Sequence, residues 1–480
     1  MTDTIRDYAF IIGGDDVSSA QWIDVLNPAS GLAFARVPAG TADDINAAVK
    51  AARTASAGWA ATPPAVRGRL LREMARLILE RREELAIMES TDTGKPLRQA
   101  RADVDVTARY FEFYAAAGET LFGDTMSINP DHFAYTIRQP FGVAGHIVPW
   151  NYPLQISART VAPALAAGNT SVLKPAEEAP MGAIMLAQIA RDAGVPPGVF
   201  NVVTGYGHQA GAALSAHPGI NHLSFTGSNE VGELVAIAAA HNHVPVVMEL
   251  GGKSPNILFD DADLDAAVPM IVNAIVQNAG QTCSAGSRLL VQESIHTDVI
   301  ARLTTAFTNI TVGVGLDDPE LGPLISAKQR DRVLSLISAV VDGHQGTVRT
   351  GGSVPAHLAD QGYFVEPTLI DNVDPTAEIA QVEVFGPVLV VTTFADEAQA
   401  LMLANSTDYG LIAGVWTRDV GRAHRMARGI EAGQVFVNTY GAGGGVELPF
   451  GGVKKSGHGR EKGVEAIIGY TQVKSVVVRM

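Results

Sequence analysis

The chain has 480 residues, one cysteine and a formal net charge of −15, and this length predicts at least two domains because one hydrophobic core rarely serves so many residues. The negative charge argues against a nucleic-acid partner, since affinity for nucleic acid depends on cationic side chains that neutralise phosphates. A lone cysteine cannot form an intramolecular disulfide, and neither a signal peptide nor an apolar run long enough to span a membrane is recognisable, so we expect a cytoplasmic protein without a membrane partner.

The first third of the chain is predicted to be helical. Residues 41–55, TADDINAAVKAARTA, start with Thr41 in a capping position and place Asp44 three residues later, close to a capping box. Residues 63–90 predict one long amphipathic helix that opens with prolines and ends near Gly94-Lys95-Pro96.

Apolar strands alternate with helices from residue 141 onward. Strands are expected at 141–149, 170–175, 199–203 and 221–225, and helices at about 154–167, 180–193, 208–216 and 228–241. This alternation indicates βαβ crossovers and a parallel sheet. A second alternating set follows 246–259 and runs to about residue 438. The tail, GYTQVKSVVVRM, is expected to be a strand that pairs with a distant strand or with another subunit.

Glycines follow the strand at 199–203 at positions Gly205, Gly207 and Gly211. Glycines between a strand and a helix let a phosphate approach the helix N-terminus. The spacing is one residue longer than the usual dinucleotide fingerprint, so this turn alone is equally consistent with a plain loop.

Two further strand ends carry residues suited to a dinucleotide. Ser228 starts the helix after the strand at 221–225, where unpaired N–H groups favour a phosphate. Lys174 could donate to ribose hydroxyls, and Glu177 could accept from a 2′-hydroxyl while repelling a 2′-phosphate. Each charge alone could belong to a solvated loop, but three such strand ends in one sheet favour a dinucleotide site.

Three polar residues in apolar surroundings are candidates for catalysis. Cys283 lies in QNAGQTCSAGS and is either a nucleophile or a chance core residue. Asn151 stands where a strand turns into a helix, so its amide could donate to an oxyanion or simply cap the helix. Glu249 ends an apolar strand and is either a base with a raised pKa or one half of a salt bridge.

Together these segments resemble the NAD(P)-dependent aldehyde dehydrogenase superfamily over nearly the whole chain. The matching segments, in order, are VPWNYPL, KPAE, TGYG, FTGS, MELGGKSPNI, NAGQTCSAGSR, EVFGP and PFGGVKKSGHGRE. ELGGKSPNI and GQTC are the most specific of them.

The resemblance implies Cys283 as nucleophile, Glu249 as general base and Asn151 as oxyanion donor. The thiolate would add to an aldehyde, hydride would pass to the nicotinamide, and water deprotonated by the glutamate would hydrolyse the thioester. CoA-acylating members of the family generally lack this base, so hydrolysis to a carboxylic acid is expected. A retired enzyme kept as a binding protein would have lost one of the three residues, and an esterase would not need the intact cofactor segments.

The same resemblance implies an NAD site, with NADP as a less favoured alternative because of Glu177. Lys174 and Glu177 would bind the adenosine ribose, and Ser228 and the Gly207 region would face the pyrophosphate. The further residues implied for the cofactor are Trp150, Gly211, Phe225, Val231, Leu250, Glu383 on the nicotinamide ribose, and Phe385 at the ring. No metal site is expected.

Substrate residues are implied on one helix and one loop. Gln155 and Arg159 share a helical face with Asn151. Arg159 stands where many relatives carry an apolar residue. It could pair with an anionic substrate, form a salt bridge with an acidic neighbour, or extend its charged end to a subunit surface. The loop 439–452 contains Gly441, Gly443, Gly444 and Gly445, whose missing side chains suggest a wide or mobile entrance to the substrate site. The same loop contains Glu447, which could attract a cationic substrate. That expectation conflicts with the anionic substrate that Arg159 would favour. Tyr152 and Phe450 complete the predicted substrate set.

The implied fold is α/β, with a Rossmann-like parallel-sheet cofactor domain, an α/β catalytic domain and a small β oligomerisation arm. Residues 1–121 and 141–250 would bind NAD, and 251–452 would form the catalytic domain. Residues 122–140 and 466–480 would form the arm and bridge the subunits of a homodimer or homotetramer.

Overall fold

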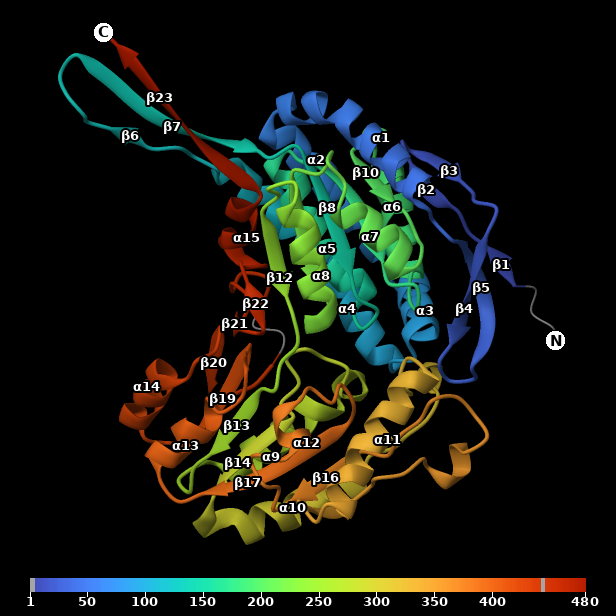
Figure 1. Cartoon of the computed structure of the whole chain (residues 1–480), viewed down its shortest axis with the longest axis vertical. Coiled ribbons are helices and arrows are strands. Elements are labelled where there is room, and N and C mark those ends of the chain that lie inside the picture. Colours follow the sequence, from blue (N-terminus) through green and yellow to red (C-terminus); the bar gives the residue numbers. More distant parts are fainter. Residues whose placement is uncertain (1–4, 442–444) are drawn as a thin grey trace.

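The computed structural model describes residues 5–441 and 445–480 and consists of two α/β bodies with a β arm that projects from one end (Figure 1). Each body is built around one large, mostly parallel sheet, so the α/β class predicted from the alternating pattern is confirmed. Within the two described ranges, no helix combines the length and the apolar character needed to cross a membrane. Residues 442–444 of the predicted glycine loop lie outside the described residues.

The first sheet has eight strands, five of which come from residues 141–249. In spatial order they are β22 (Gly457–His458), β12 (Val246–Glu249), β11 (His222–Thr226), β8 (Val143–Val148), β9 (Thr170–Pro175), β10 (Phe200–Val202), β2 (Phe10–Ile12) and β3 (Asp15–Val17). The strands from β12 to β10 run parallel, and antiparallel strands flank them on both sides. The four strands predicted between residues 141 and 225 are confirmed.

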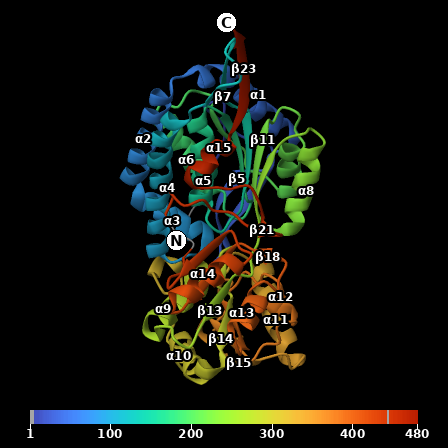
Figure 2. The same cartoon turned by 90° about the vertical axis from the view of Figure 1, so that its left-hand side faces the viewer.

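Helices cover both faces of the first sheet (Figure 2). One face carries α2 (Pro64–Glu80), α3 (Arg82–Thr93), α4 (Leu97–Ala117), α5 (Pro153–Ala167) and α6 (Met181–Asp192). The other carries α1 (Ala42–Ala61), α7 (Ala212–Ser215) and α8 (Asn229–Ala240), and a π turn, η2 (Gly207–Gly211), precedes α7. The four predicted crossover helices are therefore present, although the first part of the predicted helix at 208–216 is the π turn.

The N-terminal third departs from the prediction in two ways. The single helix over 63–90 is wrong, because Arg81 adopts φ −97° and ψ 20° and separates α2 from α3, which lets each helix bury its own apolar face. A wholly helical N-terminal third is also wrong, because most of the first 40 residues form strands. Besides β2 and β3 these are β1 (Arg6–Asp7), β4 (Trp22–Asn27) and β5 (Leu32–Pro38), which form a three-stranded sheet.

The second sheet has seven strands and lies in the other body. In spatial order they are β15 (Thr347–Thr350), β16 (Thr368–Asp371), β17 (Val388–Phe394), β14 (Arg288–Gln292), β13 (Pro255–Leu258), β19 (Ile412–Trp416) and β20 (Gln434–Val437). All pairs except β15–β16 are parallel. Its helices are α9 (Leu264–Val276), α10 (His296–Thr308), α11 (Ala327–Asp342), α12 (Glu378–Gln381), α13 (Glu397–Ala404) and α14 (Val420–Gly429).

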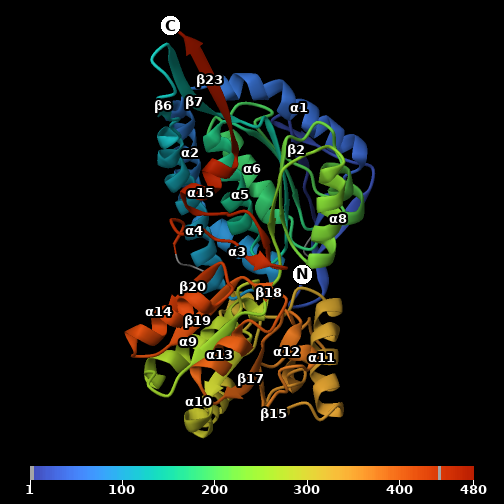
Figure 3. The same cartoon turned by 60° about the vertical axis from the view of Figure 1, so that its left-hand side comes forward.

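The C-terminal strand β23 (Thr471–Arg479) finds its partner within the chain. It runs antiparallel to β7 (His132–Pro140), which also pairs with the short β6 (Thr125–Met126). Figure 3 shows this ribbon projecting beyond the helices, after α15 (Gly463–Gly469). Of the two partners predicted for the tail, the distant strand is therefore confirmed.

Replacement of Thr41 by Ala tests the capping box that starts α1. The Thr41 side chain accepts from the Asp44 N–H, and the Asp44 carboxylate accepts from the Thr41 N–H at 2.8 Å. We expect Thr41→Ala to lower the free energy of unfolding by about 1 kcal/mol, measured by urea denaturation. Thr54→Ala, at an exposed position within the same helix, is the control, and an equal loss in both variants would contradict the role of the cap.

Candidate active site

Four strands of the first sheet end at the same edge and deliver most of the predicted residues. β8 leads to Trp150 and Asn151, β9 contains Lys174, and β12 ends at Glu249. β11 contains Phe225, and its last residue lies opposite Glu249 in the register of β11 and β12. The carboxyl edge of a parallel sheet is where α/β folds bind ligands, so the fold itself gathers these side chains.

Lys174, Glu177, Gly207 and Gly211 form one cluster at this edge. The Lys174 ammonium donates to Glu177 Oε2 at 2.9 Å, and the Gly207 N–H donates to Glu177 Oε1 at 3.2 Å. A Cβ added at Gly211 would lie 4.0 Å from Cδ of Lys174. Burial alone would raise the pKa of Glu177, but the lysine lowers it below its ordinary value. The carboxylate is therefore held ionised, as recognition of a ribose hydroxyl requires.

The start of α8 provides a second polar surface at the same edge. Ser228 is the N-cap, and its side chain accepts from the Val231 N–H at 3.4 Å. Val231 is half-exposed on the first helical turn, and Leu250 packs against the adjacent Gly232. The N–H groups of this turn favour an anionic group.

Glu383 and Phe385 approach the first sheet from the other body. Glu383 Oε1 accepts from the Gly252 N–H at 2.9 Å, and burial raises the pKa of this carboxyl to about 7. The Phe385 ring stands edge-on to Trp150, with 5.2 Å between the ring centroids. Residues separated by more than 200 positions in sequence therefore meet in one place.

The turn before Cys283 has an unusual backbone. Asn278, Ala279 and Gly280 all adopt the left-handed conformation, with φ of 50°, 54° and 71°. Non-glycine residues rarely do so, because the side chain crowds the backbone, and surrounding contacts must hold them. The Asn278 amide supplies such a contact by donating to the Asn151 carbonyl at 2.8 Å.

Gln281 and Asn151 complete the framework around the thiol. Asn151 Nδ2 donates to the Gln281 carbonyl at 2.9 Å, which engages one of its two N–H donors. Gln281 Oε1 accepts from the Ile325 N–H at 2.9 Å. No sequence pattern indicated roles for Asn278 and Gln281, although asparagine and glycine in NAG are typical of left-handed turns.

Cys283 itself is partly buried, and this burial raises the pKa of its thiol to about 12. The charges of Arg159 and Lys462 oppose this effect, while the carboxyls of Glu383 and Glu249 add to it. Gly252 backs the Cys283 carbonyl closely, since a Cβ there would lie 2.5 Å from its oxygen. The segment 249–252 at the end of β12 and the loop residues 281–283 are thus in direct contact.

Glu249 is buried, and neither carboxylate oxygen has a hydrogen-bond partner among residues 5–441 and 445–480. Burial raises its pKa well above the ordinary value, and the nearby Glu461 carboxyl adds to the rise, whereas Arg159 opposes it. A buried carboxyl without direct partners fits a proton acceptor better than one half of a salt bridge.

Arg159 does not present a free charge to a substrate. It forms a buried ion pair with Glu461, donates to Thr226 Oγ1 at 3.4 Å, and lies 5.1 Å above the Phe450 ring. The acidic-neighbour alternative for Arg159 is therefore the one found. Glu461 is the last residue of the eighth matching segment, PFGGVKKSGHGRE, but no local pattern indicated that it would neutralise Arg159.

Three other predicted substrate residues also have partners within the chain. Glu447 binds the exposed Arg109 at 2.6 Å, which compensates the negative charge expected to attract a cation. Gln155 Nε2 donates to Asp103 Oδ1 at 3.3 Å and so points to the helix layer. Tyr152 lies next to residues 277–283, the loop that carries Cys283 (the thiol loop). Its hydroxyl forms a hydrogen bond with Thr282 Oγ1 at 2.8 Å.

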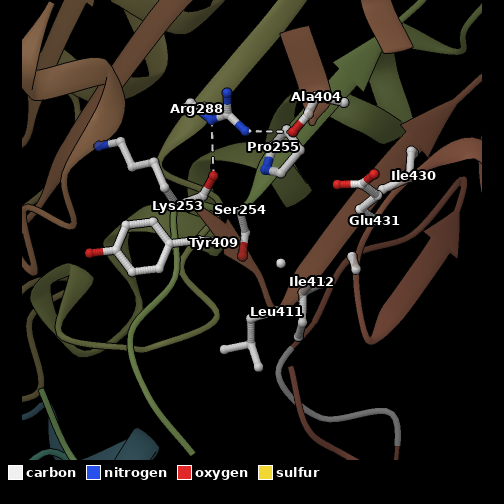
Figure 4. A pocket seen from close by; sticks show the side chains of 12 residues that line it. Lys253, Ser254, Pro255, Arg288, Ala404, Tyr409, Leu411, Ile412, Ile430 and Glu431 are labelled. Atoms are coloured by element: carbon white, nitrogen blue, oxygen red, sulfur yellow. Dashed lines mark hydrogen bonds between the residues drawn. The ribbon is translucent and has the colours of Figure 1, made fainter. Parts of the chain in front are cut away.

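A small recess lies where the segment 253–255 meets Arg288 at the start of β14 (Figure 4). The buried guanidinium donates to the carbonyls of Lys253, Leu403 and Ala404, each at 2.9 Å. These bonds tie the start of β13 to α13 and so fix the segment that continues from Gly252. Burial lowers the pKa of the Lys253 amine to about 7.

Comparisons with known proteins agree with this geometry. The aldehyde dehydrogenase family model matches residues 16–476. The chain is 44% identical over 466 residues to a chloroplastic aminoaldehyde dehydrogenase (ALDH10A8) of Arabidopsis thaliana, covering 95% of this chain and 92% of that protein. It is 41% identical over 456 residues to a hydroxyisobutyraldehyde dehydrogenase of Mycolicibacterium austroafricanum, covering 95% and 90%.

Solved structures give the same result. The NAD⁺ complex of the aldehyde dehydrogenase from Bacillus cereus superposes with a TM-score of 0.96 at 40% identity, covering 99% of this chain and 97% of that one. The chain belongs to the aldehyde dehydrogenase family.

The raised pKa of Cys283 predicts how the free thiol reacts. Without cofactor, the rate of alkylation by iodoacetamide should still rise about tenfold per pH unit near pH 9, because the thiolate fraction keeps growing below the pKa. Mass spectrometry reports the reaction directly, since the chain has one cysteine. A rate that levels off near neutral pH would contradict the effect of burial.

Proposed function

We propose that the protein oxidises an aldehyde to a carboxylic acid with NAD, using Cys283 as nucleophile, Asn151 as oxyanion donor and Glu249 as general base. The observation that carries this proposal is the placement of the lone cysteine. Its loop is hydrogen-bonded to the Asn151 amide, and the Glu249 segment packs against its carbonyl. The family membership of the chain supports the reaction class.

The chain's own residues account for the first chemical step. The Cys283 thiolate adds to the aldehyde carbon, and the new oxyanion accepts from the second Asn151 N–H and from the Cys283 N–H. One such donor typically supplies roughly 3–4 kcal/mol of transition-state stabilisation. The Arg159 and Lys462 charges favour the thiolate, which burial otherwise disfavours.

NAD is the cofactor that the residues at the first sheet's edge fit. Lys174 and Glu177 would hold the adenosine ribose, the first turns after β10 and β11 would face the pyrophosphate, and Glu383 would hold the nicotinamide ribose. When bound, NAD supplies the acceptor for the hydride that leaves the former aldehyde carbon. The ionised Glu177 would repel a 2′-phosphate, which favours NAD over NADP. The Bacillus cereus relative binds NAD⁺.

Glu249 completes the reaction in this proposal. A buried carboxyl with a raised pKa can take a proton from water near neutral pH, and the hydroxide equivalent then cleaves the thioester on Cys283. The presence of this base favours release of a free acid over transfer to CoA.

The Glu249→Gln variant separates the two half-reactions. We expect a burst of about one NADH per subunit followed by turnover at least ~100-fold slower, because acylation proceeds while hydrolysis loses its base. The measurement is NADH absorbance with acidic, cationic, aromatic and aliphatic aldehydes, with intact-mass detection of the acylated cysteine. Cys283→Ala is the matched control and should give no burst. Full turnover in either variant would overturn the assignment.

We further propose that residues 1–121 with 141–250 bind NAD, that 251–452 form the catalytic domain, and that the arm bridges subunits of a homodimer or homotetramer. The ribbon of 122–140 and 466–480 exposes apolar side chains on a projecting element. They include Met126, Phe133, Val473, Val477 and Val478. Exposed apolar side chains gathered on one projecting element are typical of an interaction site. The cytoplasmic location stays a prediction.

Charged substitutions on β23 test whether the arm bridges subunits. Val473→Asp with Val477→Asp should shift the protein to a smaller species in size-exclusion chromatography with light scattering, because buried carboxylates would oppose association. Met402→Asp, at a 60% exposed position on α13, is the control. An unchanged molar mass in the arm variant would contradict the bridging role.

A further inference from the structure

The turn Gly94-Lys95-Pro96, which the sequence pattern indicates only as a helix end, buries a charged side chain beside the active-site loops. Lys95 Nζ donates to Glu89 Oε1 at 2.9 Å and to Asp103 Oδ2 at 2.6 Å, and all three side chains are buried. Burial opposes the charge, but the two carboxylates outweigh it and raise the pKa of Lys95. The ammonium is therefore a permanent cation in the interior.

Stability alone does not explain why Lys95, Glu89 and Asp103 are buried together. Removing several charges from water is expensive, and well-packed apolar residues in their place are often equally stable or more so. A buried cation is justified when its charge acts on something specific. Among the described residues, the group in front of this cation is an aromatic ring.

Lys95 Nζ lies 4.3 Å from the centroid of the Tyr152 ring, within the range of a cation–π interaction. The Tyr152 hydroxyl in turn bonds Thr282 Oγ1 at 2.8 Å. Tyr152 directly follows Asn151, and Thr282 directly precedes Cys283. The hydrogen bond thus joins the neighbours of the proposed oxyanion donor and of the proposed nucleophile.

The same region also holds the loop at Asn278 and holds α5 at Gln155. Gln99 Oε1 on α4 accepts from the Asn278 N–H at 2.9 Å, at the first residue of the left-handed turn. Asp103, one of the two partners of Lys95, also accepts from Gln155 on α5. Because the left-handed turn is held by its surroundings, loss of these contacts would let the thiol move.

We propose that Lys95 is a positioning residue for Cys283, acting through the face of Tyr152 and the hydroxyl of Thr282. This inference rests on the proposed function, in which Cys283 is the nucleophile. Lys95 touches neither substrate nor cofactor in this role. It fixes the Tyr152 ring, and the ring fixes the thiol and the Asn151 amide relative to each other.

The hydrogen bond is tested first by variants that change few atoms. We expect Tyr152→Phe and Thr282→Val each to lower kcat roughly ten- to a hundredfold, because small misplacements of reacting groups are costly, while KM for NAD stays unchanged. Thr282→Ser keeps the hydroxyl and should restore most of the loss. Tyr110→Phe is the matched control, since the Tyr110 hydroxyl is buried on α4 with no hydrogen-bond partner among the described residues.

Lys95 is tested without leaving its carboxylates unpaired. The triple variant Lys95→Met, Glu89→Gln, Asp103→Asn removes the cation and both buried negative charges together. It should lower kcat by a similar factor in the wild-type background and by much less in the Thr282→Val background, because both changes break one chain of contacts. The proposal would be overturned if the triple variant lowered kcat by the same factor in both backgrounds, or if it did not lower kcat at all.

A second readout does not depend on turnover. Iodoacetamide modifies the single cysteine without cofactor or aldehyde, and its rate should be higher in Tyr152→Phe, Thr282→Val and the triple variant than in wild type and Tyr110→Phe. Equal rates in all of them would overturn the positioning role. If the wild type makes no NADH from any aldehyde, the proposed function fails, and the alkylation rates still decide the role of Lys95.

Discussion

Gly280 packs so tightly against the Gly386 carbonyl that any Cβ at residue 280 would overlap the oxygen. This close approach joins the thiol loop to the segment that carries Glu383 and Phe385. It requires glycine for a second reason, because residue 280 has a positive φ. The remaining site depends on this contact, because it holds the loop with Cys283 against the segment with Glu383 and Phe385. Without it, these residues would belong to separate loops.

Electrostatic compensation distinguishes the groups that support the site from those that could react. Arg159 with Glu461, and Lys95 with Glu89 and Asp103, are buried groups in which each charge has an oppositely charged partner in direct contact. Glu249 has no such direct partner among the described residues, and burial raises its pKa. The carboxyl proposed as the base is therefore a buried acid whose charge is not balanced by a direct partner, and its raised pKa makes it a stronger base than an exposed carboxylate.

The site is composed of segments that lie far apart in the chain. The first sheet supplies the edge with Lys174 and Glu249, and a strand from the C-terminal region, β22, pairs with β12 directly beside Glu249. This pairing brings Glu461 to Arg159 and Phe450 beneath it. Neither sheet alone contains the full set of groups, so the arrangement of the two bodies is part of the chemistry.

The sequence by itself determined the elements that depend on neighbouring residues: the capping box at Thr41, the alternating strands and helices from residue 141, and the candidate thiol and carboxyl in their motifs. It did not determine the break at Arg81, the strands before residue 40, the partner of β23, or the partners of Arg159, Glu447 and Lys95. Capping and periodicity act over a few residues and leave a local pattern. An ion pair, a cation–π contact or a strand pairing between distant segments, some more than 300 residues apart, leaves none, because only the tertiary structure brings the two partners together.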